Sequence, residues 1–97
     1  MVVVTPPRHL VEWYRADLTG ATVAEMVAAL EVACAESGPE GPVRLVVTMA
    51  VPSDEVLYVV FAASSSDAVV GMCTQAGLPP QRVTADVDAR VHPGEVG

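Results

Sequence analysis

The sequence predicts an α+β fold of the ferredoxin-like kind, in which the order βαββαβ gives a four-stranded antiparallel sheet with two helices on one face. Four short runs are rich in β-branched and aromatic residues, and two segments repeat apolar residues every three or four positions. A chain of 97 residues, 52% hydrophobic and 18% charged, has the size and composition of one folded domain. We expect a single domain over residues 1–97, with a core at about 9–91 and flexible ends at 1–7 and 93–97.

The first strand is expected over residues 9–16, because Val11, Trp13 and Tyr14 are residue types that strands favour. The following Asp-Leu-Thr-Gly sequence at 17–20 has the composition of a turn. A polar turn of this kind ends the strand and leads into a helix.

The first helix is expected at about 23–36. Thr22 followed by Glu25 is the capping-box pattern that begins a helix, and Gly38 suits the left-handed position that ends one. One apolar stripe at helical spacing follows the cap, and it consists of Val23, Met26, Val27, Leu30 and Cys34. This stripe is the face that we expect to pack on the sheet.

Two strands are expected next, joined as a hairpin. Residues 43–51 form a valine-rich run between Pro42 and Pro52 that is too short and too β-branched for a helix. Residues 52–55 provide the turn, and residues 56–62 form the third strand. The short connection makes the pair antiparallel.

A second helix and a last strand complete the order. Ser64 with Asp67 offers a cap, and Gly77 suits the left-handed stop after an apolar stripe of Val69, Met72, Cys73 and Ala76. From residue 82 to 91 apolar and polar residues alternate strictly, which is typical of a strand with one buried face. The apolar members are Val83, Ala85, Val87, Ala89 and Val91.

The second and third strands are apolar on both faces. Strict alternation assigns Leu45, Val47 and Met49 to one face of the second strand, with Val46 and Ala50 on the other. Two helices cover only one face of a four-stranded sheet, and large exposed apolar patches are unusual in soluble monomers. We therefore expect a homodimer whose sheets pack face to face. A different protein covering the same face is the alternative.

Composition excludes several classes of function. Twelve acidic residues against five arginines and no lysine give a net charge of −7, so nucleic acid is not an expected partner. No apolar run approaches the ~20 residues that span a bilayer, and the N-terminus has no secretory pattern. We expect a cytoplasmic protein without a membrane partner, in which Cys34 and Cys73 are buried free thiols.

The sequences His-Leu-Val-Glu-Trp-Tyr at 9–14 and Ala-Gly-Leu-Pro at 76–79, followed by Arg82 and Val83, resemble a family of small bacterial ferredoxin-like proteins of unknown function. The family includes nickel-binding members, and the resemblance covers roughly residues 9–91. It implies a dimer of ferredoxin-like subunits. This agrees with the expectation drawn from the two-faced strands.

The resemblance implies only part of a nickel site. Glu12 matches the glutamate of the family's first strand, whereas Val47 and Ala62 stand where a histidine and an acidic residue are usual. A helical histidine of the family falls near Met72 and Cys73. Nickel needs several imidazole or carboxylate ligands, and aliphatic side chains cannot replace them. The sequence therefore disfavours nickel as a cofactor, with Glu12 and His9 left as the weak candidate ligands.

Four polar residues are candidates for ligand binding: Glu12, Tyr14, Asp86 and Asp88. If Val11 faces the helices, Glu12 and Tyr14 face the open side, and pairing of the first and last strands brings both aspartates to that side. Neighbouring carboxylates raise each other's pKa and can exchange protons or bind a hard cation. The alternative is that the aspartates form the solvated face of an edge strand and pair with arginines.

The sequence leaves two classes of function open. The first is a homodimeric binding module that holds a small apolar ligand, or weakly a metal. The second is a dimeric α/β-barrel enzyme of the isomerase or cyclase type, with Glu12, Tyr14 or His9 as acid and base. Fold alone supports the enzyme, and a fold does not fix a function.

Overall fold

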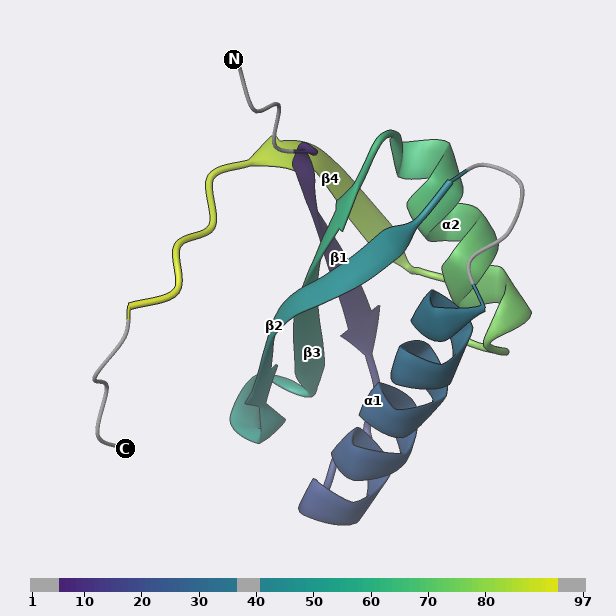
Figure 1. Cartoon of the computed structure of the whole chain (residues 1–97). Coiled ribbons are helices and arrows are strands. Elements are labelled where there is room, and N and C mark those ends of the chain that lie inside the picture. The colour runs from purple at the N-terminus through teal and green to yellow at the C-terminus, as the bar shows by residue number, and fades with distance from the viewer. Residues whose placement is uncertain (1–5, 37–40, 93–97) are drawn as a thin grey trace.

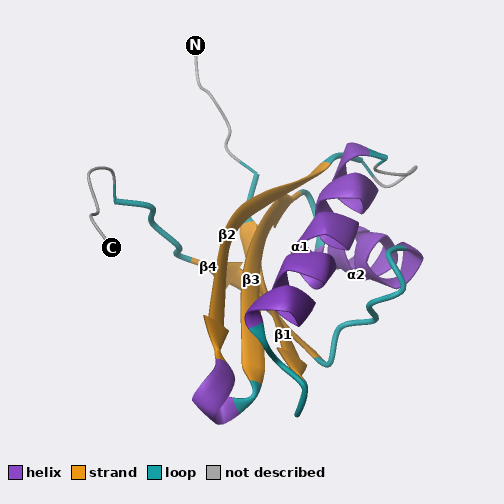
Figure 2. Cartoon of the chain, turned by 90° about the horizontal axis from the view of Figure 1, so that it is seen from below, coloured by secondary structure: helices purple, strands orange, loops and turns teal. Residues whose placement is uncertain are grey.

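The computed structural model describes residues 6–36 and 41–92 of the chain. The elements in order are β1 (Arg8–Tyr14), α1 (Gly20–Ala35), β2 (Val43–Val51), the 3₁₀ turn η1 (Pro52–Asp54), β3 (Val56–Ala63), α2 (Ser66–Gln75) and β4 (Arg82–Val87). The strands form one antiparallel sheet in the order β2-β3-β1-β4 (Figure 1). Both helices lie on the same side of this sheet (Figure 2). The predicted ferredoxin-like βαββαβ fold is confirmed.

The core lies between the sheet and the two helices. Alternate residues of the central strands β1 and β3 point into it, among them Val11, Trp13 and Phe61, all at most 3% exposed. The helices contribute Met26, Leu30, Ala33, Ala68, Val69, Met72 and Cys73. The indole Nε1 of Trp13 donates to the carbonyl oxygen of Leu78 at 3.1 Å, so the ring is buried without an unpaired N–H.

Helix α1 begins at Gly20, earlier than predicted. Thr19 is the N-cap: its hydroxyl accepts from the Thr22 backbone N–H at 3.2 Å, and the Thr22 hydroxyl accepts from the Thr19 N–H at 2.7 Å. The predicted cap of Thr22 and Glu25 is wrong, because a threonine hydroxyl here takes the place of the usual Glu or Gln. The expected stop at Gly38 lies outside the described residues.

Strand β2 has the predicted bounds, but a β-bulge changes which residues share a face. Leu45 pairs with Phe61, whereas Val47 pairs with the next residue of β3, Val60. Val46 is the extra residue, so the alternation reverses at this point. Leu45 faces the helices and Val47 and Met49 face away from them. The prediction that these three residues share one face is therefore wrong.

Helix α2 follows the prediction except at its start. Ser65, and not Ser64, is the N-cap, and its hydroxyl accepts from the Ala68 N–H at 3.2 Å. The predicted stripe packs on the core, with Val69, Met72 and Cys73 buried and Ala76 partly buried. Gly77 ends the helix region at a φ of +81°, the left-handed conformation that the sequence predicted for it.

Strand β4 ends at Val87, and the predicted continuation of the alternation to Val91 is wrong. Asp86 has a φ of +56°, and the pairing of β4 with β1 is irregular between Arg8 and Leu10. A left-handed residue interrupts the extended backbone, so the ladder ends soon after it. Residues 88–92 lie beyond the sheet, where Val91 is 62% exposed (Figure 1).

Neither cysteine forms a disulfide, as expected, and the expected burial holds for Cys73 but only partly for Cys34. Burial, with a smaller contribution from the neighbouring Cys34, raises the pKa of the Cys73 thiol to about 12. Burial also raises the pKa of Cys34, which is only partly enclosed. Thiols of raised pKa hold little thiolate at neutral pH, so neither cysteine is suited to act as a nucleophile.

We predict that Thr19→Ala lowers the free energy of unfolding by about 1 kcal/mol, because the N-cap hydrogen bond is lost. In a domain of this size that corresponds to a fall in Tm of roughly 4–8 °C. Glu25→Ala is the matched control, since Glu25 has no capping role here, and its effect should stay within about 0.5 kcal/mol. Thermal unfolding followed by circular dichroism measures both. A larger effect for Glu25→Ala than for Thr19→Ala would contradict the observed cap.

Candidate functional site

The face of the sheet away from the helices is here called the open face. Its residues on β1 are Arg8, Leu10, Glu12 and Tyr14, because the alternating residues Val11 and Trp13 point into the core. Glu12 lies opposite Tyr58 of β3 and opposite Arg82 of β4. Residues directly opposite in antiparallel strands share a face, so these side chains meet. We call Glu12, Tyr14, Tyr58 and Arg82 the Glu12 cluster.

The carboxylate of Glu12 is the centre of this cluster. The hydroxyl of Tyr14 donates a hydrogen bond to its Oε1, and Arg82 Nε lies 3.6 Å from its Oε2. Glu12 is only 7% exposed, whereas the Arg82 side chain is 68% exposed. The carboxylate is thus removed from most of the solvent and retains a partner on each oxygen. The guanidinium extends from it towards the solvent.

The electrostatics of the cluster act mainly on Tyr14. Its hydrogen bond to Glu12 is the largest cause that raises the pKa of the Tyr14 phenol, followed by burial and by the charges of Glu12 and Tyr58. Arg82 opposes these effects by lowering that pKa. The neutral phenol is the form that donates to the carboxylate, so the cluster favours a protonated Tyr14.

Apolar side chains surround the cluster on the open face. Next to Tyr58 along β2 and β3 lie Val47, Met49 and Val60, of which the first two are 38% and 57% exposed. Tyr14 is 47% exposed, and Leu10 is partly buried. Figure 2 shows neither helix on this side of the sheet. The open face therefore carries an apolar surface beside the Glu12 cluster, with Arg8 and Arg44 at the other end of the same face.

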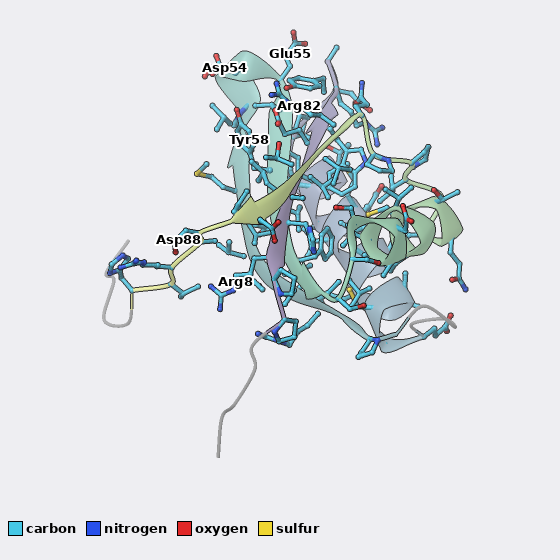
Figure 3. The ribbon with its side chains drawn as sticks, turned by 90° about the horizontal axis from the view of Figure 1, so that it is seen from above. Arg8, Asp54, Glu55, Tyr58, Arg82 and Asp88 are labelled. Atoms are coloured by element: carbon cyan, nitrogen blue, oxygen red, sulfur yellow. The ribbon has the colours of Figure 1, made fainter. Side chains whose placement is uncertain are left out.

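Asp86 and Asp88 do not lie beside Glu12, so the expected group of three carboxylates is wrong. Arg82 is the residue opposite Glu12, so Asp86 lies four residues further along β4, about 13 Å away at ~3.3 Å per residue. Asp88 is beyond the strand and pairs with Arg90 at 3.1 Å. Figure 3 shows Arg82 and Tyr58 towards one end of the sheet and Asp88 towards the other. For Asp88 the alternative of a solvated residue paired with an arginine is correct.

His9 and Glu12 lie on opposite faces of the sheet. The imidazole of His9 is 3% exposed on the helix side, with Nε2 3.1 Å from the Ala63 carbonyl oxygen and Nδ1 3.4 Å from the Ser66 hydroxyl. An odd separation in one strand sends the two side chains in opposite directions. They cannot act together as the metal ligands that the sequence left as candidates.

The positions of the resembling family's nickel pattern are also divided between the two faces. Val47 and Ala62 lie on the open face, as their strand pairing shows, whereas Met72 and Cys73 belong to α2 and are buried between that helix and the sheet. Within residues 6–36 and 41–92, no three His, Cys, Asp or Glu side chains gather where they could hold a metal ion. The described residues thus offer Glu12 alone from that pattern.

Sequence reasoning found two members of the cluster, Glu12 and Tyr14, and missed Tyr58 and Arg82. The alternation in the third strand does place Tyr58 opposite its buried residues, which is a usable signal. Arg82 needs the strand register as well, because only the pairing with β1 sets it against Glu12. No local pattern in the sequence indicates which residue of the last strand pairs with Glu12.

We predict that Tyr14 titrates above the ordinary tyrosine value of about 10. The chain has two tyrosines, so Tyr58→Phe isolates Tyr14 for titration by the ultraviolet absorbance of tyrosinate. Adding Glu12→Gln should lower the pKa of Tyr14 towards its ordinary value, because the carboxylate is removed. The stabilisation from the Tyr14 bond is present below pH 10 and is lost as the pH rises through the raised pKa. An unchanged titration in the double variant would contradict this coupling.

Comparison with known proteins supports the fold alone. No family model matches the chain, and no curated protein sequence shows significant similarity to it. Nor does any helix in the described ranges have the length and hydropathy required to cross a membrane. Among solved structures the chain is similar to the crystal structure of SCO4226 from Streptomyces coelicolor A3(2), with a TM-score of 0.70. The match covers 87% of this chain and 99% of that one at 15% identity, so the two share a ferredoxin-like fold.

Proposed function

We propose that this protein is a homodimeric binding module, in which the open faces of two copies enclose a small, mostly apolar ligand at the Glu12 cluster. The observation that carries the proposal is the buried carboxylate of Glu12 on a sheet face that neither helix covers. A carboxylate with partners on both oxygens, set within an apolar surface, resembles the sparse polar groups that fix the orientation of a ligand.

The homodimer is supported by the distribution of exposed apolar side chains. Val47, Met49 and Tyr14 are all at least 38% exposed, and all three project from the open face. They are continuous with partly buried and buried apolar residues of β1 and β3. Exposed apolar surface of this kind marks an interaction site in soluble proteins. A second copy supplies an identical and therefore self-complementary face.

The ligand site is supported by the position of the cluster in that face. A flat sheet encloses a small molecule only when something covers it, so the site depends on the second copy. Tyr58 of β3 and Arg82 of β4 flank Glu12 on either side, because each is its direct partner in the strand pairing. Side chains from three strands thus converge where the two faces are proposed to meet, which is where a bound molecule would contact both copies.

We predict that Val47→Asp converts the dimer to a monomer, because a charge in the apolar interface loses its solvation. Val70→Asp is the matched control: Val70 is also 38% exposed, but it lies on α2 on the other side of the sheet. Size-exclusion chromatography with light scattering measures the mass of each variant. A wild-type chain that is monomeric at micromolar concentration would refute the proposed assembly.

The same two variants test ligand binding with Nile red, a neutral apolar dye. We expect saturable enhancement of its fluorescence with the wild type and with Val70→Asp, and loss of saturation with Val47→Asp. Circular dichroism confirms that each variant remains folded. If the dye fails to bind the folded wild type saturably, or binds Val47→Asp equally well, the open face is not the ligand site.

A further inference from the structure

We propose that the ligand of the open face is an apolar carboxylic acid in its anionic form, with Arg82 binding the carboxylate and Glu12 positioning Arg82. This inference rests on the proposed function and adds the chemical class of the ligand. It follows from the hydrogen-bonding groups that the Glu12 cluster leaves available.

The polar groups that the cluster leaves available include the two Nη atoms of Arg82, which can only donate, and the hydroxyl of Tyr58. Glu12, its one carboxylate, already has Tyr14 on one oxygen and Arg82 on the other. Arg82 contacts Glu12 through Nε, and neither of its Nη atoms has a hydrogen bond to another residue in the described ranges. Tyr58 likewise makes no side-chain hydrogen bond within residues 6–36 and 41–92. A ligand that satisfies the Nη atoms of Arg82 must bring acceptors, because a guanidinium cannot accept a hydrogen bond.

The geometry of Arg82 favours a carboxylate among possible acceptors. With Nε directed at Glu12, the two Nη atoms remain as a planar pair of donors, which matches the spacing of two carboxylate oxygens. The side chain is 68% exposed, so a ligand can reach it. Glu12 limits the freedom of the guanidinium before the ligand arrives, which lowers the entropy cost of binding. Glu12 is therefore a positioning residue.

The charged and apolar residues around the cluster determine how the bound ligand is oriented along the open face. Asp54 and Glu55 are exposed in the turn between β2 and β3, towards the same end of the sheet as Arg82 (Figure 3). Their charges disfavour a ligand anion displaced towards that turn and leave Arg82 and Tyr58 as its favourable contacts. Away from the turn the open face continues over Leu10, Val60 and Val47. An aliphatic or aromatic body extending from the carboxylate fits this apolar direction.

Isothermal titration calorimetry with octanoate and 1-octanol tests the class of ligand, because the two probes share an eight-carbon chain and differ in charge. The protein has a net charge of −7, so unspecific electrostatics oppose the anion and any preference for it reports a local cation. We expect octanoate to bind about tenfold more tightly than 1-octanol, because a charge-assisted hydrogen bond contributes a binding free energy of about that size. Arg82→Gln should remove that preference, so that the variant binds the two probes with equal affinity.

Arg90→Gln is the matched control, because Arg90 is also exposed and ion-paired but lies beyond β4. It should retain the preference for octanoate, and Arg82→Lys should retain part of it. Equal binding of the two probes by the wild type, or a preference that survives Arg82→Gln, overturns the anion assignment even when Nile red still binds saturably. If the wild type does not bind Nile red saturably, the proposed function itself is refuted, and this outcome is distinct from failure of the anion assignment.

Discussion

The alternation of side chains along β1 is the constraint on which the rest of the structure depends. β1 is an inner strand that pairs with β3 on one side and β4 on the other, so two neighbouring strands constrain its register. Val11 and Trp13 must enter the core, and the alternation then sends Glu12 and Tyr14 to the open face. A shift of one residue would bury a charge under the helices and expose the indole. The hydrophobic core thus determines where the chain's buried carboxylate lies.

Two irregularities in the edge strands modify this regular pattern. The bulge at Val46 in β2 turns Leu45 into the core and leaves Val47 on the open face. In β4, the left-handed backbone of Asp86 ends the regular ladder and separates the later acidic residue Asp88 from the cluster. Both edges therefore deviate from strict alternation, while the inner strands keep it. Bulges are common at sheet edges because only one neighbouring strand constrains the backbone there.

The open face places a small set of donors within an acidic protein. The other carboxylates in the described part of the chain are exposed, whereas Glu12 is buried and has a tyrosine and an arginine beside it. This arrangement gives a local cation at a place where the surrounding surface is apolar and the overall charge is negative. The same face is also the one that neither helix covers. Assembly and recognition are therefore linked in the proposed function, because the surface that joins two copies is also the surface that carries the donors.

The sequence by itself determined the order of elements, the bounds of β2, the apolar faces of both helices and the assignment of Glu12 and Tyr14 to the open face. Each of these follows from local periodicity and composition. It did not determine the caps at Thr19 and Ser65, since several hydroxyl residues compete within one turn. The cross-strand neighbours of Glu12, Tyr58 and Arg82, were decided only by the tertiary structure. Which residues of β3 and β4 stand opposite Glu12 depends on strand register, and register is set by the packing of the whole core, together with the bulges that shift it.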